Sequence, residues 1–197
     1  QITKLRRFSV KFYKELKKIT GEDSSFRETG TINIATNKAR HQEYLRQKSM
    51  SKLFDIDIDI INKEKFKELY PIARNSDIVS GLHIPKDGQA DPQILTKVIA
   101  QAAKQEGVKI IEKCIFKKII KRNNEVRGIK TNLGDIKCEF IVLCAGMWSR
   151  QIGEAVGVSI PLYPNEHFYM ISEDYKKKIE NLPTFRDPDN TRVKICL

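Results

Sequence analysis

The stretch Phe140-Ile141-Val142-Leu143-Cys144-Ala145-Gly146 decides the fold. It is apolar without interruption and rich in residues that favour strands. Such a run is typical of a central parallel strand that is covered on both faces. The segment that follows carries Trp148, Ile152 and Val156 at helical spacing and reaches Gly157. The sequence therefore predicts a buried strand that leads through a small-residue bend into a helix.

The segments before this stretch fit the same sheet. Val108–Ile111 is predicted as a second parallel strand, because it follows a helical pattern. Three short β-rich runs with turn residues between them predict an antiparallel meander over Cys114–Ile120, Val126–Thr131 and Asp135–Lys137. Ligands of open α/β sheets bind beside the carboxyl ends of the strands, where Gly146 would let a dinucleotide approach the backbone. Two-dinucleotide-type flavoproteins have this arrangement, although a generic α/β domain also produces it.

The rest of the chain alternates between helical and strand patterns. Apolar residues at a period near 3.6 predict a helix from Ile2 to Ile19 that ends at Gly21. Asp91 and Pro92 are favoured at the start of a helix, and the apolar face that follows them is helical. The other predicted elements are strands at Glu28–Asn37, Phe54–Ile60, Ser80–Ile84 and Ile160–Ser172, helices at Ala39–Lys48 and Lys63–Tyr70, and a Pro-rich tail at Leu182–Pro188.

The net charge of +11 raises the question of an anionic partner. The lysines are spread along the chain among Asp and Glu, and clusters such as Lys176-Lys177-Lys178 lack the interleaved aromatic residues of a single-strand-binding surface. We therefore favour a solvated Lys-rich surface and predict no nucleic-acid partner. A basic nucleic-acid-binding module is the alternative, and it predicts an affinity that falls steeply with salt. Part of the positive charge could instead attract a carboxylate substrate.

The sequence shows neither a membrane span nor a signal peptide. No apolar run approaches the roughly 18 residues that a span needs. We expect a cytoplasmic protein, or one of the mitochondrial matrix if the source is eukaryotic. The chain begins at Gln1, already within a helical pattern, which suggests a fragment of a longer protein.

The cysteines and histidines favour neither a disulfide nor a metal site. Cys138 and Cys144 would lie about 20 Å apart on an extended strand, too far for a disulfide. The histidines, His41, His83 and His167, show no ligand spacing. We expect reduced, buried cysteines and no metal.

Four motifs follow one another in a fixed order. They are Glu28-Thr29-Gly30-Thr31-Ile32; Gly81-Leu82-His83-Ile84-Pro85 with Asp87-Gly88 and Asp91-Pro92; Cys144-Ala145-Gly146-Met147-Trp148; and Pro161-Leu162-Tyr163-Pro164 with His167-Phe168-Tyr169. With these motifs, the chain from Ile2 to about Pro188 resembles the dimethylglycine and sarcosine dehydrogenase branch of the D-amino-acid-oxidase-like FAD oxidoreductases.

This resemblance implies an α/β fold with two incomplete parts. Residues 1–26 and 76–157 would belong to a two-dinucleotide-type FAD-binding domain with a parallel sheet and a β meander. Residues 27–75 and 158–197 would belong to an antiparallel substrate domain. The family's Gly-rich FAD fingerprint does not occur in this sequence. We therefore expect this chain alone to bind FAD poorly and to be inactive.

The resemblance also implies the chemistry. A small N-methylated amine such as dimethylglycine or sarcosine would give a hydride from its N-methyl carbon to FAD. Tetrahydrofolate is a further cofactor that the full-length protein could use, and the electron acceptor is left open. Such chemistry needs no metal and no nucleophilic side chain.

Carried over position by position, the resemblance assigns cofactor contacts to Phe116, Ala145, Gly146 and Trp148. Phe116 matches a backbone contact to the FAD adenine, although relatives more often have a smaller aliphatic residue there. Trp148 lies beside Gly146, and packing of its ring on the sheet is the competing interpretation.

On the substrate side, the resemblance assigns catalytic roles to His167 and Tyr169. Strand alternation would place both side chains on one face. The tyrosine hydroxyl could hold a carboxylate or order the amine, and the histidine could change its protonation near neutral pH. Ordinary packing and hydrogen bonding are the alternative for both residues.

One alternative keeps the fold and drops the catalysis. The regulatory subunit of pyruvate dehydrogenase phosphatase shares this architecture, including a stretch like Glu166–Tyr169. The chain would then belong to a flavoprotein-like interaction module.

Overall fold

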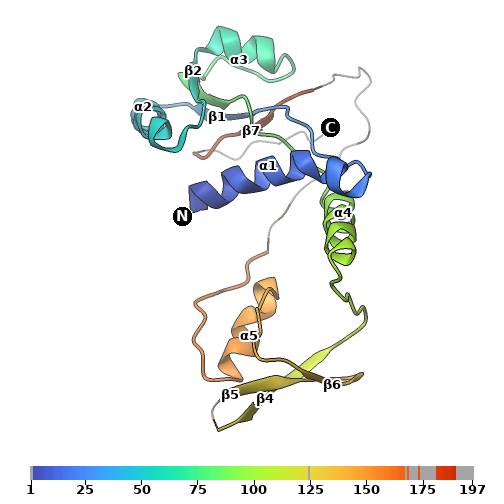
Figure 1. The fold of residues 1–197 in the computed structure, drawn as a ribbon. Coiled ribbons are helices and arrows are strands. Elements are labelled where there is room, and N and C mark those ends of the chain that lie inside the picture. Colours follow the sequence, from blue (N-terminus) through green and yellow to red (C-terminus); the bar gives the residue numbers. More distant parts are fainter. Residues whose placement is uncertain (1, 124, 167, 169–172, 174–180, 190–197) are drawn as a thin grey trace. The chain divides into compact units, whose positions relative to one another are not determined.

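The computed structural model describes residues 2–123, 125–166, 168, 173 and 181–189. The described residues fall into two compact units, one within Gln1–Val108 and Ser172–Leu197 and the other within Lys109–Ile171. The first unit is built on a four-stranded sheet, and the second is built on a three-stranded meander. Each unit is described by itself (Figure 1).

The sheet of the first unit has the strand order β2-β3-β1-β7. Its strands are β1 (Thr31–Ala35), β2 (Asp59–Ile61), β3 (Ser80–Ile84) and β7 (Thr184–Arg186). β3 pairs antiparallel with both β1 and β2, whereas β7 pairs parallel with β1. The sheet is therefore mixed, and β7 lies at its edge.

Two helices pack aromatic side chains against this sheet, one on each face. Phe66 of α3 (Lys63–Leu69) and Tyr70 are buried with Ile32 and Phe185 on one face. Tyr44 of α2 (Lys38–Ser51) packs with residues of β1 and β3 on the other face and donates a hydrogen bond of 3.0 Å to the carbonyl oxygen of Ile34. Both helices begin at asparagine N-caps, as the preference for Asn at this position favours.

A helix pair completes the first unit. Leu16 of α1 (Ile2–Thr20) packs against Val98 and Ala102 of α4 (Pro92–Gln105), and these three side chains are buried. The Asp91 carboxylate caps α4 by accepting hydrogen bonds from two backbone amides of its first turn. The predicted ends of both helices are confirmed within a residue or two.

One prediction in this unit is wrong. Phe54–Ile60 was expected to form a strand, but only Asp59–Ile61 does, because Asp55 has a left-handed φ of 52° after a short 3₁₀ helix, η1 (Lys52–Phe54). The Pro-rich tail at Leu182–Pro188, for which no strand was predicted, contains β7. Its two prolines flank the strand at an edge, where a missing amide is tolerated.

The second unit contains the predicted meander. Its strands are β4 (Phe116–Arg122), β5 (Glu125–Thr131) and β6 (Gly134–Lys137), paired antiparallel in sequence order. The chain then forms one 3₁₀ turn, η2 (Gly146–Trp148), and the short helix α5 (Ser149–Glu154). The meander and the turn before the helix are thus confirmed.

The two segments that were expected as parallel strands do not form strands here. Val108–Ile111 and Phe140–Cys144 take part in no β ladder among the described residues. Phe140 is 86% exposed and Val142 is 84% exposed. A strand covered on both faces needs neighbouring strands and two covering layers, and the described residues supply neither to these segments. Cys144 is likewise exposed, against the expectation of a buried thiol.

The C-terminal strand that was predicted over Ile160–Ser172 is not seen in its described part. Residues 160–166 have no regular secondary structure. Most of the remainder lies outside the described residues. No described helix combines the length and apolar character needed to cross a membrane.

Candidate functional site

The bend at Gly146 is open. Its φ is 55°, in the left-handed region, and apart from its chain neighbours no described heavy atom lies within 4 Å of the position that a Cβ would occupy. The amide of Trp148 donates a hydrogen bond of 3.1 Å to the carbonyl of Ala145, which closes the 3₁₀ turn. A planar ligand could therefore approach the backbone here without displacing a side chain.

The neighbouring side chains leave this bend accessible. Trp148 is 62% exposed, so its ring is not packed away on the meander among the described residues. Ser149, by contrast, is buried at the start of α5. The helix has only six residues, so its dipole adds little to anion binding at this end.

Phe116 lies in the same unit, at the start of β4, and is half-buried. It faces Thr131 in the register, and the ladder is irregular between Phe116 and Lys118. The chain just before Phe116 is held by the side chain of Asn132. This side chain accepts a hydrogen bond of 2.6 Å from the Ile115 amide and donates one of 3.1 Å to the Lys113 carbonyl. The turn residue Asn132 therefore fixes the backbone at which an adenine contact was predicted.

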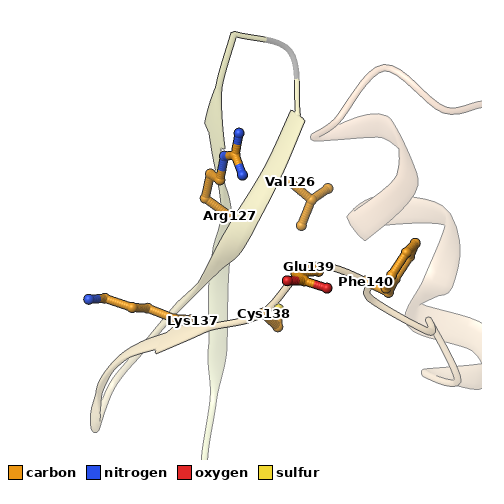
Figure 2. A pocket seen from close by; sticks show the side chains of 6 residues that line it. All are labelled: Val126, Arg127, Lys137, Cys138, Glu139 and Phe140. Carbon is orange, nitrogen blue, oxygen red and sulfur yellow. The ribbon is translucent and has the colours of Figure 1, made fainter.

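A hollow of about 580 Å³ lies against β5 and the end of β6. Figure 2 shows Val126 and Phe140 on one side of the strands and Lys137 extending to the other. The Arg127 guanidinium is held by Glu125. Cys138 and Glu139 also line this hollow, and among the described residues no hydrogen bond joins their side chains.

The first unit brings two of the sequence motifs together. The amide of Gly30 donates to the carbonyl of Asp87 at 2.8 Å, and the Thr31 hydroxyl donates to the Asp87 carboxylate at 2.8 Å. The carbonyl of Gly30 accepts from the amide of Thr184 at 3.0 Å. The motif glycine therefore joins three segments that are far apart in the sequence.

His83 stands beside this junction. Its Nε2 lies 3.0 Å from the position of a Cβ on Gly30. Burial lowers the pKa of the imidazole below its ordinary value of 6.5, while Asp59 opposes this effect more weakly. The ring is therefore neutral at physiological pH, and a neutral imidazole can both donate and accept a hydrogen bond.

The predicted catalytic pair cannot be placed. His167 and Tyr169 lie outside the described residues. Sequence reasoning also missed the polar edge of the sheet, where Asn33 faces Arg186 across the β1–β7 ladder. The signal was the alternation Thr184-Phe185-Arg186 between two prolines, which is typical of an edge strand.

Comparison with known families decides the relationship. The model of a family described as "DAO: FAD dependent oxidoreductase" matches residues 1–195. The chain belongs to this family. FAD is the cofactor of the family, and the predicted α/β fold and the predicted cofactor are confirmed in this respect.

Three relatives are similar to this chain over most of its length. The 4-methylaminobutanoate oxidase (formaldehyde-forming) of Paenarthrobacter nicotinovorans is 30% identical over 96% of the chain and 23% of the relative. The mitochondrial pyruvate dehydrogenase phosphatase regulatory subunit of Mus musculus is 30% identical over 94% of the chain and 22% of the relative. The mitochondrial sarcosine dehydrogenase of Homo sapiens is 32% identical over 89% of the chain and 20% of the relative.

A solved structure agrees with this relationship. L-proline dehydrogenase from P. horikoshii superposes with a TM-score of 0.72 and 29% identity, covering 77% of this chain and 40% of that protein. The chain spans about a fifth of the length of the curated relatives that it matches. The open bend at Gly146, where no side chain blocks the backbone, fits the approach of the cofactor.

Proposed function

We propose that the full-length protein oxidises an N-methylated, glycine-type amine, such as dimethylglycine or sarcosine, with FAD as the hydride acceptor. One observation carries this proposal. The chain is about 30% identical, over most of its length, to relatives named for 4-methylaminobutanoate and for sarcosine. Both compounds carry a methylated amine and a carboxylate.

The reaction follows from the substrate. When bound, FAD would supply the acceptor for the hydride that leaves the N-methyl carbon as its C–H bond breaks. The amine becomes an iminium, and water adds to the iminium carbon. The adduct then splits into formaldehyde and the demethylated amine, releasing one proton. The protein holds the amine in its deprotonated form and orients the methyl group.

We assign the cofactor contacts to Phe116, Ala145, Gly146 and Trp148. The exposure of Trp148 and the free space at Gly146 support this assignment. We assign Tyr169 to substrate orientation and His167 to proton exchange. We also place residues 1–26 and 76–157 in the FAD-binding part and 27–75 and 158–197 in the substrate part of the full-length protein.

A purely regulatory role is not favoured. The chain is similar to a phosphatase regulatory subunit, but at the same identity it is similar to an amine oxidase. The family model that covers the chain is that of an oxidoreductase.

The test is anaerobic reduction of the flavin. The FAD-loaded full-length protein is mixed with dimethylglycine, sarcosine or 4-methylaminobutanoate, and the loss of oxidised-flavin absorbance is followed. We expect bleaching with at least one of these amines and one equivalent of formaldehyde per reduced flavin. An absorbance that persists with all three amines would refute the proposal.

A further inference from the structure

The helix α1 carries apolar side chains on one face along its whole length. They recur at helical spacing and are Ile2, Leu5, Phe8, Phe12, Leu16 and Ile19. Leu16 is buried against Val98 and Ala102 of α4, and Phe12 packs beside it. Figure 1 shows that α4 meets the C-terminal half of α1. The first turns of the apolar face therefore extend beyond their partner helix.

The part of this face that extends beyond α4 is open. Ile2 is 69% exposed, Leu5 is 64% exposed and Phe8 is 63% exposed. We call these three residues the apolar stripe. The ring of Phe8 stacks on that of Phe12 with centroids 5.9 Å apart, so the stripe continues the packed part of the face. Three large apolar side chains in one exposed row indicate a surface that takes up a partner.

The opposite side of α1 is held by the first unit. Arg7 follows Leu5 by two positions and projects about 200° around the helix from it. The Arg7 guanidinium donates hydrogen bonds to the Asp55 carboxylate at 2.7 Å and to the Phe54 carbonyl at 2.9 Å. These contacts with η1 and the residue after it fix the rotation of α1. The apolar stripe therefore faces away from η1.

Basic side chains flank the apolar stripe. Seven of the 19 residues of α1 are Lys or Arg, and Glu15 is its one acidic residue. Lys4 and Arg6 lie one position before and one position after Leu5, so they project from the two sides of the stripe. Both are exposed, and within the described part of the chain neither forms an ion pair. The helix thus combines an exposed apolar row with unpaired positive charge on both flanks.

We propose that α1 lies on an anionic phospholipid surface, with Ile2, Leu5 and Phe8 among the acyl chains and Lys4 and Arg6 on the headgroup phosphates. A basic amphipathic helix of this kind binds in the plane of the interface. Such a surface offers both contacts at once, because its headgroups attract Lys and Arg and its acyl layer takes up apolar side chains. This inference does not depend on the proposed amine oxidation.

Two other occupants fit the helix less well. A second copy of the chain would cover the stripe, but it would bring the unpaired bases of two helices together, and like charges repel. A nucleic acid would contact the basic side chains through its phosphates, but it would leave the apolar stripe in water. The charge of α1 therefore favours the lipid surface over both.

Vesicle co-sedimentation tests this inference on the 197-residue chain and on the full-length protein. We expect both to bind vesicles of phosphatidylcholine and phosphatidylglycerol at a ratio of about two to one, and to bind phosphatidylcholine alone at least about tenfold more weakly. Leu5→Asp should weaken binding more than about tenfold, because it removes an inserted apolar side chain and adds a negative charge. Raising the salt from about 0.1 M to about 0.5 M should also weaken binding.

Two matched controls accompany these variants. Leu53 is 80% exposed in η1, which contacts the opposite side of α1, so Leu53→Asp should bind as the wild type does. The double variant Lys4→Gln/Arg6→Gln should weaken binding, whereas Lys48→Gln/Lys52→Gln removes the same charge from exposed positions elsewhere and should have little effect. Equal thermal midpoints show that Leu5→Asp is folded. If its midpoint is lower, Ile2→Asp at the start of the helix takes its place.

Several results would overturn the inference. One is that neither protein binds the anionic vesicles. Another is that Leu5→Asp binds them as tightly as the wild type does, because the attraction is then electrostatic alone. Binding by the 197-residue chain but not by the full-length protein would show that the rest of that protein covers the stripe. A dimer that is seen by light scattering and lost in Leu5→Asp, without vesicle binding, would assign the stripe to a second copy of the chain.

Discussion

The backbone amide of Gly30 and the backbone carbonyl of Asp87 are joined by a hydrogen bond of 2.8 Å. Gly30 has a φ of 80°, which few residues other than glycine adopt readily. Its carbonyl in turn accepts from the amide of Thr184. The edge strand that carries Arg186 is therefore positioned by the same glycine that links the first two sequence motifs.

Asp87 should be needed for the stability of this junction. Its carboxylate accepts from the buried Thr31 hydroxyl at 2.8 Å and from the Gly88 amide at 2.9 Å. We expect Asp87→Ala to lower the free energy of unfolding by about 2–3 kcal/mol, because two hydrogen bonds are lost. Asp135→Ala, on the exposed strand β6, should change it by less than about 0.5 kcal/mol. Urea unfolding measures both, and equal effects would contradict the role of Asp87.

Two glycines of the meander form a matched pair. Gly128 and Gly134 have φ values of 154° and 122°. A Cβ on Gly128 would lie 2.2 Å from the carbonyl oxygen of Ile136, whereas a Cβ on Gly134 would meet nothing within 4 Å. We expect Gly134→Ala to cost about 1 kcal/mol from backbone strain and Gly128→Ala to cost more than about 3 kcal/mol. If thermal unfolding shows a similar loss of stability in both variants, the strands of the meander shift to accommodate the added Cβ at Gly128.

The sequence predicted elements better than it predicted pairing. The meander, α1 and α4 follow from local signals, namely turn residues, the Asp91 cap and the glycine after α1, and these signals do not depend on distant segments. The strand predicted at Phe140–Cys144 depended on neighbours that a local pattern cannot specify. An apolar run indicates that a segment is suited to burial, but it does not indicate which strands would pair with it or which layers would cover it.

The candidate site was predictable to a similar extent. The bend at Gly146 was predicted because a small residue after an apolar run has a local signature, and its backbone is open. The assignment of this bend to the cofactor stays a prediction. Arg186 was missed because its environment is created by Gly30 and Asp189, one of them distant in the sequence. Contacts of that kind appear only after the sheet has formed.

The ion pair of Asp189 with Arg40 should make stability depend on acid pH. The hydrogen bonds from Arg40 hold the pKa of Asp189 below its ordinary value of 3.8. Because the folded state binds this proton less readily than the unfolded state, stability is full above about pH 4 and is lost as the pH falls further. Arg40→Gln should lower the unfolding midpoint at pH 7 and flatten this acid dependence. If the Arg40→Gln variant loses stability with falling pH as steeply as the wild type, the acid dependence comes from other carboxylates.

His83 should act in the same direction at higher pH. Burial lowers the pKa of His83 below 6.5, so the unfolded state takes up the proton first as the pH falls. Stability is therefore complete above pH 6.5 and decreases as the pH falls toward the folded-state pKa. The variant His83→Gln should lose this part of the pH dependence. Denaturant midpoints between pH 5 and 8 provide the measurement, and a slope that persists in the variant would exclude His83 as its source.

Val142 provides the sharpest test of the segment that first indicated the fold. In the chain described here it is 84% exposed, so Val142→Ser should change the unfolding free energy of the 197-residue chain by less than about 0.5 kcal/mol. If the full-length protein covers Phe140–Cys144 as a central parallel strand, the same change should cost it about 1.5–3 kcal/mol, because an apolar side chain is then removed from a core. Val98 is 1% exposed, so Val98→Ser should destabilise both proteins. This control shows that the measurement detects the loss of a buried apolar side chain. Equal, small effects of Val142→Ser in both would mean that the apolar run is not a buried strand, and the assignment of Gly146 to a cofactor crevice would lose its basis.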